Sequence, residues 1–427
     1  MTSKAKGRQQ LKGWNMRPIG EVCKTSAGGT PLKSKKEYYE GGKVPWLLSG
    51  EIAQGEIYQS SRFITEAGLK NSSAKIFPVD TVLVAMYGAT AGQVGILRFR
   101  SATNQAVCGI FPNDKLVSKF VYYALLSKKE ELITKAVGNA QPNISQAKVK
   151  KTEIPVLSIC QQERIVAILD EVFAGIDVAI ANTEKNLTNA RELFESYLDT
   201  VLTNKGNSWV DTTLGAEINL ITGFPFKSKC YTDSDQSIRL LRGDNIIQGS
   251  LRWDGVKKWP KSNVDTFLDY QLREGDVVLA MDRPWVKAGL KHAQLNKDDL
   301  PCLLVQRTAC LRGGDNLENR FIFYLISGRT FIQHVLGSQT GIGVPHISGK
   351  QIKSFKFVKP PLSEQRSIIK MLGTLALKRQ CLASVYQRKL SALNELKQSI
   401  LQKAFTGELT AETTNHAKKT TEEVIAA

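Results

Sequence analysis

The sequence predicts an α+β fold: two similar mixed α/β domains separated by two long, antiparallel, coiled-coil-like helices with pseudo-two-fold symmetry. Three observations predict it. The chain repeats itself at a spacing of about two hundred residues. Each copy ends in a stretch of about forty residues that lacks proline and has apolar residues at steps of three and four. The rest of each copy consists of short runs of Val, Ile and Leu between glycines and prolines, as strands and turns require. A length of 427 residues agrees with two or three domains.

The repeat is visible as similar segments that follow one another in the same order. Trp14 begins one copy and Trp209 the other. The matched pairs are Pro31–Lys35 with Pro225–Lys229, Leu47–Glu51 with Leu240–Asp244, Val82–Met86 with Val277–Met281, Phe120–Tyr123 with Phe321–Tyr324, and Pro142–Ser145 with Pro345–Ser348. In each copy a helix-like stretch follows the predicted strands, at residues 119–136 and 320–336.

The long helices are expected at about residues 161–203 and 364–405. The apolar positions of the first include Ile165, Leu169, Val172 and Ile176 and, after a phase shift, Ile180, Leu187, Ala190, Phe194, Tyr197 and Val201. Those of the second are Ile368, Leu372, Leu375, Leu382, Tyr386, Leu393, Leu396 and Ile400, with Arg379 and Lys389 as exceptions. This spacing is typical of a coiled-coil seam, although an amphipathic surface helix packed on its own domain would also produce it.

These patterns divide the chain into six segments. We expect a basic tail at residues 1–13, a first domain at 14–157, a helical spacer at 158–206, a second domain at 207–360, a second spacer at 361–410 and a disordered tail at 411–427.

The net charge of +18 and the isoelectric point near 9.5 favour a polyanionic partner, because Lys and Arg gain affinity by releasing counterions from phosphates. A surplus that serves only solubility is the alternative. The excess is uneven: residues 1–150 hold 22 basic and 10 acidic residues, whereas residues 151–208 hold 5 and 9. An acidic helix suits contact with a protein.

The composition also excludes several classes of protein. No secretory signal and no run of about eighteen apolar residues is present, so we expect a soluble protein without a membrane partner. Seven scattered cysteines without a CxxC spacing indicate reduced, buried thiols and the cytoplasm. We expect neither a metal nor a cofactor.

Two motifs resemble a known family. Gln161–Asp170 and Pro361–Arg366 look like the "PPLxEQxxIVxxLD" start of the long helices in type I restriction–modification specificity (S) subunits, and Ala404–Thr410 looks like the end of their second helix. The first copy departs from this pattern, with Leu157-Ser-Ile159 in place of Pro-Pro-Leu and Gln161 in place of Glu. The resemblance covers about residues 14–410.

The resemblance implies a function. The two domains would be target-recognition domains that read a bipartite, asymmetric site in double-stranded DNA. The helices would dock two methyltransferase (M) subunits and, where the system has them, two restriction (R) subunits. Such a subunit carries no activity of its own.

The residues agree with a non-catalytic chain. We find no Asn/Asp-Pro-Pro-Tyr/Phe motif, no Walker A sequence and no convincing S-adenosylmethionine loop. Two alternatives stay open: a DNA methyltransferase or nuclease with degenerate motifs, and a coiled-coil adaptor whose basic domains bind DNA non-specifically or bind acidic proteins.

The candidate DNA-binding residues fall into two groups. Phosphate contacts are expected from the repeated Pro-x-Lys-Ser-Lys loops: Lys33, Ser34, Lys35, Lys36, Lys227, Ser228 and Lys229. Base contacts are expected where the two copies differ beside matched segments: Tyr87 and Thr90 against Asp282, Arg283 and Trp285; Asn104 and Gln105 against Gln306 and Arg307; Gln141 and Asn143 against Thr340 and His346. A framework loop or a satisfied structural polar group is the alternative for each.

Overall fold

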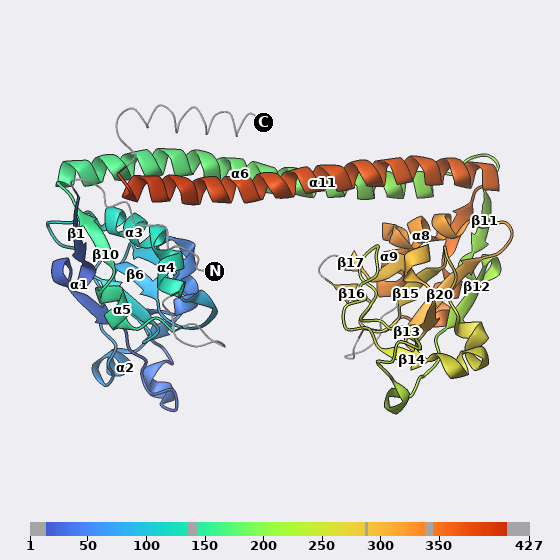
Figure 1. Ribbon diagram of the computed structural model, residues 1–427, viewed down its shortest axis with the longest axis horizontal. Helices are drawn as coiled ribbons and strands as arrows, with labels where there is room; N and C mark the ends of the chain where they lie inside the picture. The colour runs from blue at the N-terminus through green and yellow to red at the C-terminus, as the bar shows by residue number, and fades with distance from the viewer. Residues whose placement is uncertain (1–13, 135–142, 287–288, 338–344, 408–427) are drawn as a thin grey trace, which may run out of the picture. The chain divides into compact units, whose positions relative to one another are not determined.

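The computed structural model describes residues 14–134, 143–286, 289–337 and 345–407, without the side chain of Asn263 (Figure 1). Two helices are much longer than the others: α6 (Ile159–Thr203) and α11 (Leu362–Phe405). Each begins two residues before the predicted start. The chain divides into two compact units, one formed by residues up to Glu184 together with those from Gln387 onward, and the other by Lys185–Tyr386. Each unit therefore contains part of both long helices and one mixed α/β domain, called its head: residues 15–156 (β1 to β10) in the first unit and 210–359 (β11 to β21) in the second.

The head of the first unit is built on a five-stranded sheet of order β2-β9-β6-β7-β4, a three-stranded sheet of order β5-β3-β8 and a strand pair β1-β10. Its elements are β1 (Asn15–Pro18), α1 (Ile19–Val22), β2 (Thr25–Ala27), η1 (Lys36–Tyr38), β3 (Val44–Leu47), η2 (Ser49–Gln54), β4 (Glu56–Ile57), β5 (Phe63–Ile64), α2 (Glu66–Lys70), β6 (Val82–Ala85), η3 (Gly88–Thr90), β7 (Val94–Leu97), β8 (Ala102–Thr103), β9 (Val107–Ile110), α3 (Ser118–Ser127), α4 (Lys129–Thr134), α5 (Gln146–Lys150) and β10 (Glu153–Val156).

The head of the second unit has a similar topology, with a four-stranded sheet of order β12-β20-β15-β18 in place of the five-stranded one, a three-stranded sheet β14-β13-β19, a pair β11-β21 and an added hairpin β16-β17. Its elements are β11 (Val210–Thr213), α7 (Leu214–Glu217), β12 (Ile218–Thr222), η4 (Ser228–Cys230), β13 (Ser237–Leu241), β14 (Lys258–Pro260), η5 (Lys261–Tyr270), β15 (Val277–Ala280), β16 (Trp285–Val286), β17 (Gly289–Leu290), β18 (His292–Gln294), η6 (Lys297–Asp299), β19 (Cys302–Leu304), β20 (Thr308–Gly313), α8 (Asn319–Ser327), α9 (Arg329–Gly337), α10 (Gly349–Ser354) and β21 (Lys356–Lys359).

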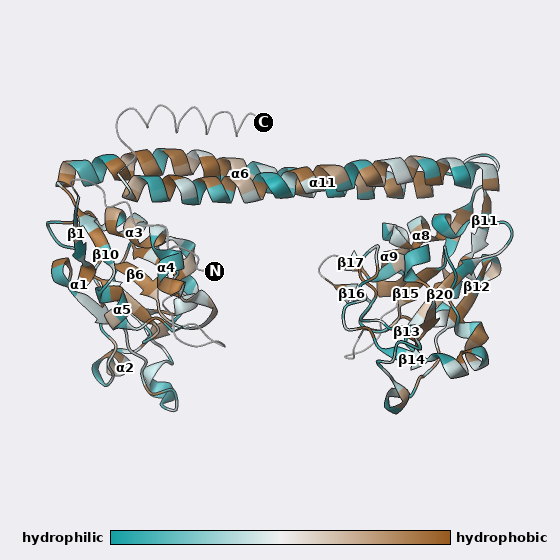
Figure 2. Cartoon of the chain, viewed as in Figure 1, coloured by the Kyte–Doolittle hydropathy of each residue, from teal (hydrophilic) through white to brown (hydrophobic). Residues whose placement is uncertain are grey.

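The strands of both heads are short and apolar because their central members are covered on both faces. Every residue of β6 and β15 is buried. Hydropathy colouring shows the same concentration of apolar residues in the sheets (Figure 2). Continuous apolar runs of this kind are typical of fully buried strands.

Strand pairing corrects the sequence alignment of the repeat at two points. Leu47 pairs with Thr103 and Leu241 with Leu304, so Leu47 corresponds to Leu241, not to Leu240. Met86 N–H donates to the carbonyl of Ala106 and Met281 N–H to that of Arg307. Arg307 therefore corresponds to Ala106, and Gln306 to Gln105. The alignment by residue identity was wrong at these points because the connections between the matched strands differ in length in the two copies.

We expected a single helical stretch in each head, at residues 119–136 and 320–336. The structure has two helices in each place: α3 and α4 in the first head, and α8 and α9 in the second. In the first head α3 ends before Lys128, and in the second α8 ends before Gly328, whose backbone is extended. Apolar periodicity continues across both breaks, which explains why the sequence pattern shows none.

The long helices run antiparallel within each unit. In the first unit, Lys397 of α11 forms a 2.7 Å ion pair with Asp177 of α6. In the second, Met371 Sδ accepts a 3.0 Å hydrogen bond from Tyr197, and the Arg379 guanidinium lies 4.5 Å from the centre of the Phe194 ring. Residues later in α11 thus contact residues earlier in α6.

The predicted seam is confirmed most fully in the first unit. There Ile165, Leu169, Val172 and Ile176 are buried together with Leu393 and Ile400. In the second unit Ile368 and Leu372 are buried, but Tyr197 and Leu382 are exposed, and Leu198 and Leu202 are buried instead, against the core of the head. Tyr197 and Leu382 line the space between the two helices, as predicted for seam residues, but are not buried in it.

One buried glutamine fastens each head to its helix. Gln162 Nε2 donates to the carbonyls of Lys115 (3.0 Å) and Leu157 (2.8 Å), and its Oε1 accepts from Val117 N–H (2.8 Å). In the second unit, Gln365 makes the same three bonds.

The partners of Gln365 are the carbonyls of Asn316 (3.0 Å) and Pro360 (2.8 Å) and the N–H of Glu318 (3.0 Å). Both glutamines are fully buried. All six partners are main-chain groups. These are the Gln residues of the motifs at the starts of the two long helices.

Two further expectations have an outcome here. All seven cysteines are free thiols, but only Cys23, Cys108, Cys302 and Cys310 are buried, so the prediction of burial was wrong for Cys160, Cys230 and Cys381. Of the helices in the described ranges, none combines the length and the apolar character that crossing a bilayer requires.

Replacing Gln162 by Leu should lower the free energy of unfolding by about 3 kcal/mol, because one N–H and two carbonyls, all in partly buried hydrogen bonds, lose their partner. Chemical denaturation of the full chain measures this. Gln402→Leu, an exposed glutamine later in α11, is the control and should stay within about 0.5 kcal/mol of the parent. Equal effects of both changes would disprove the role of the buried amide.

Candidate nucleic-acid interface

In the first head, three separate predicted segments meet at the end of β6. Tyr87 follows β6 and forms an isolated antiparallel bridge with Asn143, and Met86 bonds on one side to Ala106 and on the other to Ile144. Gln105 is exposed and hydrogen-bonded to the hydroxyl of Thr30. The meeting point therefore presents Tyr87, Gln105 and Asn143 to solvent from three different segments.

Two polar atoms beside this meeting point are buried without a partner among the described residues. They are Asn104 Oδ1 and Thr103 Oγ1. Thr90 is half-buried, and its hydroxyl donates a long 3.4 Å bond to the Tyr87 carbonyl within the η3 turn. Thr90 thus serves the turn, whereas the side chain of Asn104 has unused hydrogen-bonding capacity.

In the second head, the corresponding segments surround a hollow of roughly 670 Å³. It is lined by four predicted residues, Asp282, Arg283, Gln306 and Arg307, and by six others: Tyr231, Arg242, Gly243, Asp244, Lys291 and Val305. Asp282 holds the cluster together, because its carboxylate pairs with Arg307 (3.1 Å) and with His346. His346 reaches Asp282 through the bridge that corresponds to the Tyr87–Asn143 bridge of the first head.

The sequence interpretation missed Lys291, Arg242 and Tyr231. Lys291 lies between the buried residues Leu290 and His292, so its context resembles a core strand. Burial lowers the pKa of Lys291 from its ordinary value, and the carboxylate of Asp244 partly opposes the shift. The sequence around it, Gly289-Leu-Lys-His-Ala-Gln294, mixes polar and apolar residues, so it did not mark Lys291 as a buried cation.

The lysine loops are exposed in both heads. Lys33, Lys36, Lys227 and Lys229 extend into solvent, and Lys33 and Lys36 have no ion-pair partner among the described residues. Lys35 differs, because it lies 3.6 Å from Glu37 and 5.1 Å from the centre of the Tyr38 ring. In the second head the loop with the exposed Ser228 leads into the hollow, since Tyr231 follows η4 directly.

Of the remaining candidate base-contacting residues, one is described by the structure and two are not. Trp285 is exposed on the β16–β17 hairpin, beside the hollow residue Arg283 in sequence. Gln141 and Thr340 lie outside the described residues. Within the described ranges, no group of three or more His, Cys, Asp or Glu side chains is placed to hold a metal ion.

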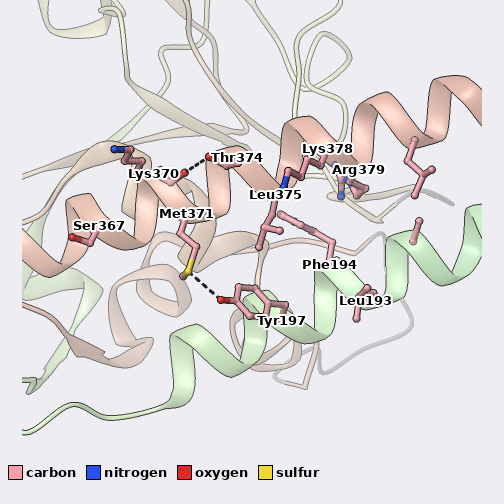
Figure 3. A pocket seen from close by; sticks show the side chains of 12 residues that line it. Leu193, Phe194, Tyr197, Ser367, Lys370, Met371, Thr374, Leu375, Lys378 and Arg379 are labelled. Atoms are coloured by element: carbon pink, nitrogen blue, oxygen red, sulfur yellow. Dashed lines mark hydrogen bonds between the residues drawn. The ribbon is translucent and has the colours of Figure 1, made fainter.

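A second kind of surface lies on the helices of the second unit. A groove of roughly 790 Å³ runs between α6 and α11 (Figure 3). Its floor is apolar, and Lys370, Lys378 and Arg379 stand along it. The apolar lining includes Leu193, Phe194, Tyr197, Met371, Leu375 and Leu382. Exposed leucine, tyrosine and methionine side chains from both helices, gathered along one groove, are typical of a protein-binding surface.

The comparisons with known proteins agree on one family. The family model of the type I restriction modification DNA specificity domain matches residues 11–189 and 217–384. The specificity subunit of type I restriction enzyme EcoAI from Escherichia coli is 38% identical over 168 residues, which cover 39% of this chain and 28% of that protein. The MjaIX specificity subunit from Methanocaldococcus jannaschii is 23% identical over 94% of both chains.

Solved structures share the fold. One chain, from a study of complex assembly and conformational transition of the type I R-M system, has a TM-score of 0.76 at 19% identity, covering 94% of this chain and 100% of its own length. The HsdS subunit from Thermoanaerobacter tengcongensis has a TM-score of 0.53 at 19% identity, covering 95% of this chain and 100% of that chain.

Replacing Lys33, Lys35 and Lys36 by Ala should weaken binding to all duplexes alike and flatten the dependence of log K on log salt by up to about one unit per lost phosphate contact. Lys35→Ala alone should have the smallest effect of the three single changes, because Glu37 already neutralises it. Titration of labelled duplexes at several salt concentrations measures both. An unchanged slope would assign these lysines to the framework.

Proposed function

Because the chain belongs to the type I restriction modification DNA specificity domain family, we propose that it recognises a two-part, asymmetric site in double-stranded DNA, one half-site per head. It acts as the specificity subunit of a type I restriction–modification complex. Catalysis resides in partner subunits, and the complex works in the cytoplasm.

The observation that carries this proposal is that the two heads share one topology but carry different side chains at equivalent positions. At equivalent positions the first head has Tyr87, Ala106 and Asn143, and the second has Asp282, Arg307 and His346. DNA bases are distinguished by the pattern of donors and acceptors that faces them. Two heads that offer different patterns from the same scaffold should recognise different half-sites.

Partner docking is proposed for the long helices. The groove of the second unit has an apolar floor flanked by lysine and arginine, so it suits an apolar, acidic-flanked helix of a methyltransferase subunit. The equivalent part of the first unit is better filled. Leu393 and Ile176 are fully buried there, where the second unit has Ala190 and Arg379.

The repeat supports two methyltransferase subunits per chain, one on each unit. Because the surfaces differ, the two subunits should bind with different affinities. Restriction subunits join the complex beyond these two.

Replacing Leu193 by Asp should remove one of the two methyltransferase subunits or weaken its binding at least about tenfold, because a carboxylate then occupies an apolar contact. Leu377→Asp is the matched control, since Leu377 is equally exposed but does not line the groove. Native mass spectrometry of the co-expressed complex gives the stoichiometry. A one-to-one complex of the parent chain at saturation would rule out the two-copy proposal, and equal effects of both variants would rule out the groove.

Exchanging residues 209–360 for the corresponding head of a related specificity subunit should change one half of the methylated sequence only. The segment must include both strands of the β11–β21 pair, because Val210 pairs with Lys359 and a cut at residue 356 would split it. Mapping methylated adenines in cells that carry the chimera tests this. If both half-sites change, or the spacing shifts while the helices are intact, the heads are not independent readers.

A further inference from the structure

The hollow of the second head contains an unusually placed lysine. Only 8% of Lys291 is exposed, and its main chain is fixed on both sides by hydrogen bonds to Pro284 (2.7 Å) and Ala280 (3.0 Å). Its ammonium has no hydrogen bond or ion pair among the described residues. Lysine is almost never buried without a partner, because removing a cation from water is costly. The position therefore lacks a structural explanation.

The first head shows that the fold does not require a cation here. Strand pairing aligns Val94 with His292, so Gln93 corresponds to Lys291. Gln93 is neutral, and its Oε1 accepts a 3.1 Å hydrogen bond from Lys129. The same scaffold is thus satisfied by a paired amide in one head and holds an unpaired ammonium in the other.

Arg283, which lines the same hollow, has a second energetically unfavourable feature: a strained backbone conformation. Its φ of 45° lies in the left-handed region, which favours glycine, and the corresponding residue of the first head is Gly88, with a φ of 72°. An arginine in this conformation strains the backbone. Arg283 nevertheless lines the hollow together with Lys291.

The charge pattern of the hollow fits a base pair better than a phosphate. Four cations line it, Arg242, Arg283, Lys291 and Arg307, but so do the carboxylates of Asp244 and Asp282. Carboxylates repel a phosphate. In the major groove, a G·C pair presents the N7 and O6 acceptors of guanine beside the N4 amine of cytosine, so it calls for both kinds of group.

We propose that Lys291 and Arg283 donate to guanine N7 and O6 of a G·C pair in the half-site bound by the second head. Asp282 is a positioning residue, because it holds Arg307 and His346 at the rim. The first head, with Gln93 and Gly88 at these positions, does not use this mode. The inference rests on the proposed function.

The experiment uses the full chain, co-expressed with its methyltransferase partner, and maps methylated adenines to define the site. Binding of the purified complex is then measured on duplexes that carry each single base-pair change. Lys291→Met should weaken binding to the parent site about 10- to 100-fold, equivalent to about 1–3 kcal/mol. Duplexes with the critical G·C pair replaced should bind the variant and the parent complex alike, and methylation should relax at that pair alone.

Gln93→Met is the matched control and should leave the second half-site unchanged. Thermal unfolding separates recognition from folding, because the Tm of Lys291→Met should equal or exceed that of the parent once the buried cation is gone. If its Tm falls, Arg283→Gly decides: glycine suits that backbone, so the fold is retained and the same base pair must still relax.

Four results would overturn the inference: a uniform loss on all sequences, no loss, relaxation in the first half-site, or a second half-site without a G·C pair. A parent complex that methylates adenines without sequence preference would instead disprove the proposed function.

Discussion

The architecture of each unit depends on the buried glutamine at the start of its long helix. Gln162 and Gln365 each join the start of the helix to the residues just before α3 or α8 and to the residue two positions before the helix, through three hydrogen bonds to main-chain atoms. A buried amide whose groups are all satisfied stabilises one geometry, because any shift of the helix would leave polar groups unpaired in an apolar setting. Since these bonds use only main-chain atoms of their partners, the partner side chains can vary without breaking them.

The two heads have the same framework, but the second has several energetically unfavourable features at its hollow. Lys291 is buried without a partner, and Arg283 and Arg307 both have a positive φ, at 45° and 65°. The first head has Gln93, Gly88 and Ala106 at the equivalent positions, so it has neither a buried unpaired cation nor a strained non-glycine residue there. Unfavourable features that cluster at a hollow, on a scaffold that manages without them elsewhere, are characteristic of a binding site.

The sequence predicted the parts of this structure that follow from periodicity and repetition. Apolar residues at steps of three and four define α6 and α11 to within two residues, because a helix buries one face along its whole length. The candidate residues that follow Met86 and Met281 were found because the two copies match up to these methionines and differ immediately after them. The breaks at Lys128 and Gly328 were missed, because apolar periodicity continues through them.

Two other features were beyond any local pattern. The residues around Lys291 are of mixed polarity, and only the three-dimensional structure shows that Lys291 is buried and lines the hollow. The role of Gln162 was hidden for a different reason. A motif shows that a glutamine is present, but its partners Lys115 and Val117 lie more than forty residues earlier in the chain.

The main-chain joint also separates recognition from assembly in physical terms. Substitutions at the hollow, such as those at Lys291 or Arg283, touch neither Gln365 nor the helix seam, so under the proposals above they should change base contacts at little cost to docking. The helix pair has the opposite property. Ala190 and Arg379 stand where the first unit has the buried Leu393 and Ile176, and these two differences open the groove of the second unit. A change of either residue should therefore alter the proposed docking in one unit while both heads keep their own cores and their own joints.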